Sequence, residues 1–368
     1  MGVTFDTAGP GDDLALRDMA RRHEMPGKIR LSYAREPSFF DALAVEGQHN
    51  EVIVARDDRT GEIVGLATRS IKTAYLNGRQ APLGYLGGLR LEPSHRRGLA
   101  LARGFGFLRR RHRDRRTRLY LTTILESNAE ARTLLTSRRA GLPDYHDLGR
   151  LCCLALGIHR SRRPGGRWIG SVRTARSDDL ARVVEFWREH GPERQFFPAY
   201  SARDLTSSTG LLRGLAPEDI LVAEHRGEIL GTVAVWDQRA FRQNVVIGYS
   251  PLLGSVRRAY NGLARLAGYP RLPVPGDGLD LAHLSLTCAR QNDREVFAAL
   301  LQEAVELCRG RCSSLVAGLH ERDPLLEVLL ERRHLAYPSR LYAVTWDEGS
   351  EARRELDDRV PYVELGGL

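Results

Sequence analysis

The chain has little lysine, cysteine or methionine, and it has no long apolar run. Only Lys28 and Lys72 are lysines, although lysine and arginine together number 55. Five scattered cysteines do not make a disulfide framework, and Cys308 and Cys312 lack the neighbouring histidine or cysteine ligands of a zinc site. No stretch is long enough to span a bilayer, and no apolar leader precedes the first predicted strand. We therefore expect a cytoplasmic protein with buried thiols, no metal site and no membrane partner.

The positive charge is carried almost wholly by arginine. The net charge is +9, and a basic run covers residues 109–118. This run contains no aromatic residues that could stack on bases. It ends a predicted helix, where cations complement the negative end of the helix dipole. A general excess of arginine over lysine is also typical of GC-rich coding. Binding of a nucleic acid is therefore a hypothesis that we do not favour.

Two segments of the chain repeat one pattern of strands. Residues 51–65 and residues 219–231 each predict two strands joined by a polar turn with glycine. The strand and helix that follow each hairpin also correspond. A length of 368 residues accommodates two domains of ordinary size. The sequence therefore predicts a tandem protein.

The seam between the repeats is a polar, basic stretch broken by Pro164-Gly165-Gly166. A proline-rich segment of the second repeat, with a predicted helix near Val256 to Leu266, has no counterpart in the first, and insertions of this length are often functional. The predicted divisions are a first domain at 1–158, a linker at 159–170, a second domain at 171–350 with an insertion at about 240–278, and a tail at 351–368.

The segment 84–104 predicts a strand that enters a helix through a tight basic turn. Gly87-Gly88 favours a bulge, Pro93 ends the strand, and apolar residues at helical spacing indicate a helix from near Gly98. Free N–H groups in a first helical turn, aided by arginines, form an anion site. The alternative is an ordinary strand, turn and helix with solvated arginines.

This segment resembles motif A of the GNAT acyltransferase superfamily, in which loop amides bind the pyrophosphate of acetyl coenzyme A. Two registers compete, because residues 97–102 place Ala100 where the family prefers glycine, and residues 95–100 place His95 where it prefers arginine or glutamine. The resemblance implies an α/β (mixed α+β) fold of two tandem GNAT-like domains, each a central mixed, mostly antiparallel sheet flanked by helices. It also implies these coenzyme contacts: Leu89, Arg90, Leu91, His95, Arg96, Arg97, Gly98, Leu99, Ala100, Leu101, Ala102 and Asn128.

A second region is similar to the next part of that family's pattern. A β-rich run at 119–124 precedes Asn128 and a helix from Ala129 to about Ser137. Gly141 and a strand at 151–156 supply the turn and the last hairpin that the resemblance implies. Many relatives carry a tyrosine late in the helix to protonate the thiolate, and here Leu134 or Leu135 replaces it. Tyr145 or bulk water would then be the acid.

The second repeat lacks the anion-binding turn. Residues 288–293 contain no glycine, and Asp293 is placed to cap the following helix and to repel a phosphate. We therefore expect the second repeat to be structural, or to close over the acceptor. A diverged copy that still binds coenzyme is the alternative.

The resemblance implies acyl transfer from acetyl coenzyme A to a small-molecule or peptide amine in one ternary complex. A backbone N–H near Leu89 to Leu91 would polarise the carbonyl, and Glu126 or Glu92 would remove the proton. Either carboxylate could instead be a surface salt-bridge partner, and His95 could contact phosphate or act as the base. The acceptor would lie at residues 12–47, where the segment 35–40 either closes over it or forms a capped turn. A coenzyme-binding regulator without turnover is the second hypothesis.

Overall fold

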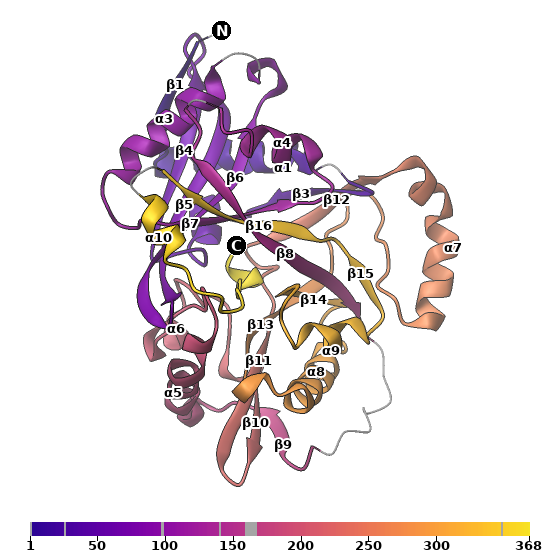
Figure 1. Ribbon diagram of the computed structural model, residues 1–368. Coiled ribbons are helices and arrows are strands. Elements are labelled where there is room, and N and C mark those ends of the chain that lie inside the picture. Colours follow the sequence, from indigo (N-terminus) through magenta and orange to yellow (C-terminus); the bar gives the residue numbers. More distant parts are fainter. Residues whose placement is uncertain (1, 26, 97–98, 140, 159–167, 347–348) are drawn as a thin grey trace.

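One continuous sheet passes through both halves of the chain. The computed structural model describes residues 2–368 except 26, 97–98, 140, 159–167 and 347–348. It is a mixed α/β structure whose large, mostly antiparallel sheet is flanked by helices, which confirms the predicted fold class (Figure 1). Residues 159–167 of the predicted linker lie outside the described residues.

The first half, residues 1–158, supplies one edge of the sheet and the helices beside it. Its strands are β1 (Val3–Thr7), β2 (Glu24–Met25), β3 (Ile29–Ala34), β4 (His49–Asp57), β5 (Ile63–Leu76), β6 (Arg79–Leu91), β7 (Tyr120–Leu125) and β8 (Asp144–Gly157). Its helices are α1 (Asp13–Arg22), α2 (Phe39–Leu43), α3 (Ala100–His112) and α4 (Ala129–Leu135).

The second half, residues 171–368, supplies the other edge. Its strands are β9 (Ser171–Thr174), β10 (Ile220–His225), β11 (Glu228–Trp236), β12 (Gln243–Tyr249), β13 (Leu281–Ala289), β14 (Ser314–His320), β15 (His334–Ala336) and β16 (Ser339–Thr345). Its helices are α5 (Leu180–His190), α6 (Ala202–Thr206), α7 (Pro251–Ala267), α8 (Arg294–Cys308), α9 (Leu326–Leu330) and α10 (Ser350–Arg354).

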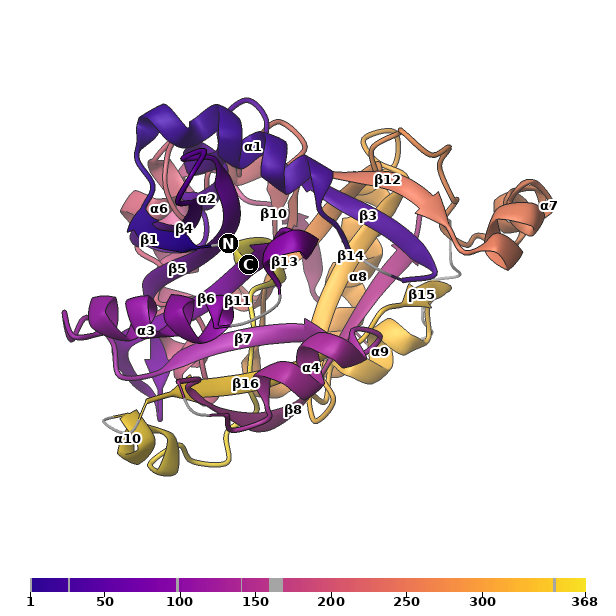
Figure 2. The same cartoon turned by 90° about the horizontal axis from the view of Figure 1, so that it is seen from above.

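The two halves exchange strands at the centre of the sheet. The strand order is β1-β4-β5-β6-β7-β16-β8-β14-β13-β11-β10-β9, with β15 also paired to β8. Strand β16 of the second half therefore lies between two strands of the first, and β8 of the first half pairs with β14 of the second. Figures 1 and 2 both show β16 beside β8. The hairpin expected within the first half near residue 151 is thus not formed, because the neighbours of β8 come from the second half.

The repeated hairpins are present in both halves. Strands β4 and β5 pair antiparallel, and so do β10 and β11. Between the described strands, parallel pairing occurs at β6–β7 and at β13–β14. The same arrangement of hairpin, parallel pair and intervening helix thus occurs twice.

The predicted insertion reaches back to the first half. Its strand β12 pairs antiparallel with β3, with Gln243 opposite Ala34 and Asn244 opposite Tyr33. The predicted helix is α7, which begins earlier than expected at Pro251 and projects from the body (Figure 1). The segment predicted to hold the acceptor is therefore walled on one side by the second half.

The apolar clusters join residues of both halves. The largest packs α8 and α9 against strands of the second half and against β8 of the first, while Phe105 and Leu108 of α3 pack on β6 and β7 together with residues of β16. All five cysteines are free, and four of them are buried, as predicted. Among the described helices, none combines the length and the apolar character needed to cross a bilayer.

Candidate active site

Strands β6 and β7 form a fork. They pair in parallel only at Gly84–Tyr120 and Tyr85–Leu121. Two side-chain contacts hold the base of the fork: the Tyr85 hydroxyl lies 2.8 Å from Thr123 Oγ1, and the Thr122 hydroxyl donates to the Leu86 carbonyl at 2.7 Å. Beyond this point the β7-facing edge of β6 has no strand beside it. Leu89 accordingly remains 47% exposed although it belongs to an inner strand.

A bulge in β6 sets the direction of its free amides. Gly88 has a φ of 65°, in the left-handed region, where the register against β5 shifts. Further along, Glu92 N–H donates to the Val64 carbonyl of β5. Because successive residues of a strand alternate, the N–H groups of Leu91 and Leu89 point away from β5, toward the open side of the fork.

The helix after the fork begins without a side-chain cap. Leu99 is its N-cap residue, carries no capping hydrogen bond and is 75% exposed, and the first turn contains no acidic residue. The first amides of α3 are therefore available to an anion. Ala100, Leu101 and Ala102 form this turn, whereas Arg97 and Gly98 lie outside the described residues. Arg96 lies before the turn, and its Nε donates to the Leu91 carbonyl at 2.9 Å.

His95 is engaged within the fold. Its Nε2 lies 3.0 Å from Asp57 Oδ2, and its Nδ1 lies 2.9 Å from Ser94 Oγ. The N–H of Arg59 and the imidazole of His95 are the main groups that lower the pKa of Asp57 to about 2. The buried imidazole thus anchors the turn after β6. A direct role in the reaction or in phosphate binding stays a prediction.

The two carboxylates predicted as bases lie at different places. Glu92 follows β6 and lies 3.4 Å from an Arg22 guanidinium nitrogen and 3.9 Å from His23 Nε2, at the end of α1. Glu126 follows β7 and accepts a hydrogen bond of 2.7 Å from Arg150 of β8. The structure does not bring the two carboxylates to one shared partner among the described residues.

Tyr145 and Asn128 lie on the side of the sheet that carries α3 and α4. Tyr145 packs at 6.0 Å, ring centroid to ring centroid, against Tyr342, and it belongs to the cluster that contains α3 and α4. Burial raises its pKa above the ordinary tyrosine range. Asn128 caps α4 by accepting from Ala131 N–H at 3.1 Å. Ser38 likewise caps α2, so the segment 35–40 contains the capped turn that was one of its two interpretations.

A buried polar cluster behind the fork was not found from the sequence. Lys72 donates to the Gly367 carbonyl at 3.1 Å, and Arg242 donates to Glu46 at 2.6 Å and to the Ala42 carbonyl at 2.9 Å. Burial lowers the pKa of Lys72 to about 8 and that of Arg242 to about 10. The available signal was that Lys72 is one of only two lysines. Arg242 gave none, because its partners lie some two hundred residues earlier.

The equivalent fork in the second half is filled. Strands β13 and β14 also pair over a short stretch, here three residues, and Leu286 carries the bulge conformation with a φ of 53°. Here Glu364 accepts from Leu286 N–H at 2.8 Å, and the Tyr362 hydroxyl accepts from Thr287 N–H at 3.1 Å. Residues near the C-terminal end thus bind the amides of Leu286 and Thr287, whose counterparts in the first fork are free.

The helix after the second fork is capped. Asp293 accepts from the N–H groups of Glu295 and Val296 at 2.8 and 3.1 Å, as its position in the sequence predicted. The carboxylate occupies the amides to which a phosphate would bind, and it would repel one. The two forks therefore differ at both places that a coenzyme needs.

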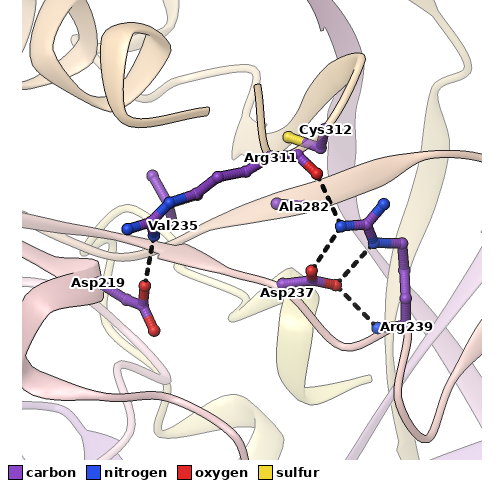
Figure 3. A pocket seen from close by; sticks show the side chains of 7 residues that line it. All are labelled: Asp219, Val235, Asp237, Arg239, Ala282, Arg311 and Cys312. Carbon is purple, nitrogen blue, oxygen red and sulfur yellow. Dashed lines mark hydrogen bonds and ion pairs between the residues drawn. The ribbon is translucent and has the colours of Figure 1, made fainter. Parts of the chain in front are cut away.

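A pocket of about 370 Å³ in the second half is a weaker candidate. Its charged side chains come in pairs: Arg311 lies 2.8 Å from Asp219, and Arg239 lies 2.7 Å from Asp237 (Figure 3). Because these charges compensate one another, the pocket presents no unmatched group to a ligand.

An acidic cluster near β4 has the spacing of metal ligands. His49, Glu51 and Asp114 offer ligand atoms within 4.8 Å of one another. Arg69, however, donates to Glu51 at 2.6 Å and to Asp114 at 2.8 Å, and Arg111 also binds Glu51. These guanidinium groups already supply the cations of the cluster. The basic run 109–118 is thus partly engaged in ion pairs within the first half.

Comparisons with known proteins identify the fold. No protein-family profile matches the chain, and no curated protein sequence matches it significantly. A GCN5-related glucosamine N-acetyltransferase region of a fungal multi-domain GH3 β-N-acetylglucosaminidase is 13% identical with a TM-score of 0.64, and the match covers 93% of this chain and 38% of that one. N-myristoyltransferase of Saccharomyces cerevisiae with bound myristoyl-CoA is 11% identical with a TM-score of 0.58, covering 93% and 79%. A GCN5-related N-acetyltransferase from Anabaena variabilis is 8% identical with a TM-score of 0.52, covering 93% and 72%.

Proposed function

We propose that this chain, whose fold is that of the GNAT acyltransferases, transfers an acyl group from an acyl coenzyme A to an amine. The observation that carries the proposal is the open fork between β6 and β7, followed by the uncapped start of α3. A diphosphate fits this place because amides and arginine lie there and no carboxylate is present in the first turn. We propose acetyl coenzyme A as the donor.

The coenzyme would be held by the turn and by the fork. The amides of Leu99 to Ala102 would bind the pyrophosphate, with help from Arg96, which precedes this turn. Arg97 and Gly98, outside the described residues, stay predicted contacts. The edge of β6 at Leu89 to Leu91 would pair with the pantetheine arm, and Asn128 at the start of α4 would lie along it. Acyl coenzyme A, when bound, supplies an activated thioester.

The chain's own groups would then polarise, position and exchange protons. The Leu89 or Leu91 N–H would donate to the carbonyl oxygen that gains charge during attack. Glu92 is our first candidate for the base, because it contacts the end of α1 on the side predicted to hold the acceptor. Glu126 is the alternative. Tyr145, on the side of the sheet that carries α3 and α4, would protonate the departing thiolate.

The second half would not bind a coenzyme of its own. Its fork is filled by Tyr362 and Glu364, and its helix is capped by Asp293. We propose that it completes the sheet and walls the acceptor site through β12.

A coenzyme-binding regulator without turnover remains the second candidate. It is favoured by the absence of the tyrosine that many relatives carry late in this helix, where α4 has Leu134 or Leu135. Calorimetry with acetyl coenzyme A, followed by a thiol-release assay on a panel of amines, separates the two. The enzyme predicts binding and thiol release, and Glu92→Gln should abolish release without loss of binding. Binding with no release on any amine would favour the regulator, and no binding at all would contradict both.

A further inference from the structure

Two arginines near the fork have no carboxylate partner. Arg35 donates to the carbonyl of Ala34 at 3.2 Å, and Arg90 donates to the carbonyl of Gly88 at 3.2 Å. Neither forms an ion pair with any residue that the structure describes. Both side chains are half-buried, so each guanidinium group has lost part of its hydration without gaining a counter-charge.

The acidic group that acts on both arginines is already engaged. Glu46 acts electrostatically on both arginines, but its carboxylate is bound by Arg242 at 2.6 Å and lies 3.2 Å from the Ser70 hydroxyl. Burial, and then the charge of Arg35, lowers the pKa of Arg90 to about 10. The charge of Arg35 thus disfavours the charge of Arg90. An arrangement of this kind gains stability when an anion binds between the two groups.

Arg35 is held in place by the second half. Gln243 of β12 accepts from the N–H of Glu36 at 3.1 Å and donates to the Glu36 carbonyl at 3.1 Å. The guanidinium carbon of Arg35 lies 5.7 Å from the ring centroid of Tyr33, in the strand paired to β12. The second half thus holds the backbone next to Arg35, and Tyr33 of the first half lies against its guanidinium group.

Arg90 faces away from the helix that would hold the coenzyme. Its neighbour Leu91 and Ala100 of α3 pack against the same apolar cluster, and successive residues of a strand point to opposite faces. The charges of both Arg35 and Arg90 act on the Tyr33 hydroxyl. The two arginines therefore share the face that carries β3, which belongs to the predicted acceptor segment.

We propose that Arg35 and Arg90 bind an oxyanion, a carboxylate or a phosphate, carried by the acceptor amine. This assignment rests on the proposed acyl transfer and narrows its acceptor to amines that bear an acidic group. Planar guanidinium groups bind both kinds of oxyanion with paired N–H donors. The anion would position the amine beside the fork, so the two arginines would act on substrate binding rather than on proton transfer.

Matched acceptor pairs test the class of substrate. Thiol release is measured with phenylalanine against phenylalaninamide, and with glucosamine 6-phosphate against glucosamine. We expect the anionic member of at least one pair to have a kcat/KM about 10- to 100-fold higher, the range for a charged hydrogen-bonded contact. The pair that shows the preference identifies carboxylate or phosphate. Equal use of charged and neutral members by an active enzyme would overturn the proposal and leave acyl transfer intact.

Variants connect the preference to the two arginines. Arg35→Gln and Arg90→Gln should each remove most of the preference through KM, with smaller effects on kcat. Arg35→Lys should retain part of it. Arg30→Gln is the matched control, because Arg30 lies on β3 beside Glu24 at 3.3 Å and is largely exposed. If the control lost the preference equally, or if the Gln variants kept it, the assignment would be wrong.

Two further readouts separate the possible failures. Calorimetry with acetyl coenzyme A should give the same affinity for Arg35→Gln, Arg90→Gln and the wild type. A matching loss of coenzyme affinity would mean that the arginines hold the coenzyme instead. Inorganic phosphate should raise the Tm of the wild type and of Arg30→Gln more than that of the double variant of Arg35 and Arg90. This difference in Tm shift tests the anion site even if no amine is acylated. Equal Tm shifts in the wild type and the double variant would refute the anion site.

Discussion

At the scale of single residues, the free start of α3 distinguishes the first half from the second. Leu99 is exposed and leaves the first amides of the helix free, whereas Asp293 caps its counterpart. This difference could be predicted in part from the sequence. Asp293 is a common N-cap residue, and the turn that resembles motif A has no capping residue at the corresponding position. The precise register of the coenzyme amides was not readable, since two overlapping motifs fit equally well.

Leu99→Asp should weaken binding of acetyl coenzyme A by at least about 10-fold, because a carboxylate at the helix start would compete for the amides and repel phosphate. Leu99→Asn, which is similar in shape but neutral, should lose much less. Asn292→Asp in the second half should leave affinity unchanged. Calorimetry on the three variants provides the measurement. Equal losses of coenzyme affinity in Leu99→Asp and Asn292→Asp would mean that the coenzyme site is assigned to the wrong half.

Asp57 should make folding stability depend on acid. Its pKa is about 2 in the folded protein, below its ordinary value of 3.8, chiefly because Arg59 N–H and His95 bind the charged form. The stabilisation is therefore present above about pH 4 and is lost as the pH falls toward 2. Urea unfolding at pH 5, 4 and 3 should show a smaller decline for Asp57→Asn than for the wild type. Parallel declines in the two proteins would contradict this account.

At the scale of elements, the bulge in β6 depends on glycine. Gly88 has a φ of 65° and an open environment, since a Cβ added there would lie no closer than 3.4 Å to Thr68. Gly88→Ala should therefore cost roughly 1–2 kcal/mol in free energy of unfolding through backbone strain alone. It should also lower kcat, because the bulge directs the Leu89 N–H toward the fork.

Gly106→Ala in α3 is the matched control for this substitution. No atom lies within 4 Å of an added Cβ there, and alanine is favoured inside a helix, so stability should rise by up to about 1 kcal/mol. Urea denaturation measures both variants. The same sign of change at both positions would be inconsistent with the strained bulge.

Local elements were largely predictable from the sequence. Helix α8 spans Arg294–Cys308, as expected, because an apolar periodic face follows an Asp cap. Strand β6 ends at Leu91, before Pro93, as the missing proline N–H requires. Strand β5 is longer than expected, reaching Leu76, because it pairs with β6 beyond the repeated hairpin.

At the scale of the whole molecule, the exchanged strands make the halves interdependent. Strand β16 fills the space between β7 and β8, so residues 1–158 alone would leave one edge of β7 and both edges of β8 unpaired. This exchange could not be predicted, because local patterns show that a strand exists but not which distant strand pairs with it. The same reason hid Arg242, whose partners Ala42 and Glu46 lie in the other half, and the relation between Arg35 and Arg90, which lie far apart in the sequence.

The two halves should consequently unfold together. Hydrogen exchange at increasing urea should show β5 and β11 losing protection at the same concentration. A chain that ends at residue 333, and so lacks β15 and β16, should be insoluble or unfolded. Two separate unfolding transitions, or a stable folded chain that ends at residue 333, would mean that the strand exchange contributes little to stability.

The most direct test of the central claim is a crystal structure with coenzyme A bound. We predict density for the diphosphate at the start of α3, with the pantetheine arm between β6 and β7 and the second fork still filled by Tyr362 and Glu364. Coenzyme in the second half, or a first fork that stays without ligand at saturating concentration, would contradict the assignment.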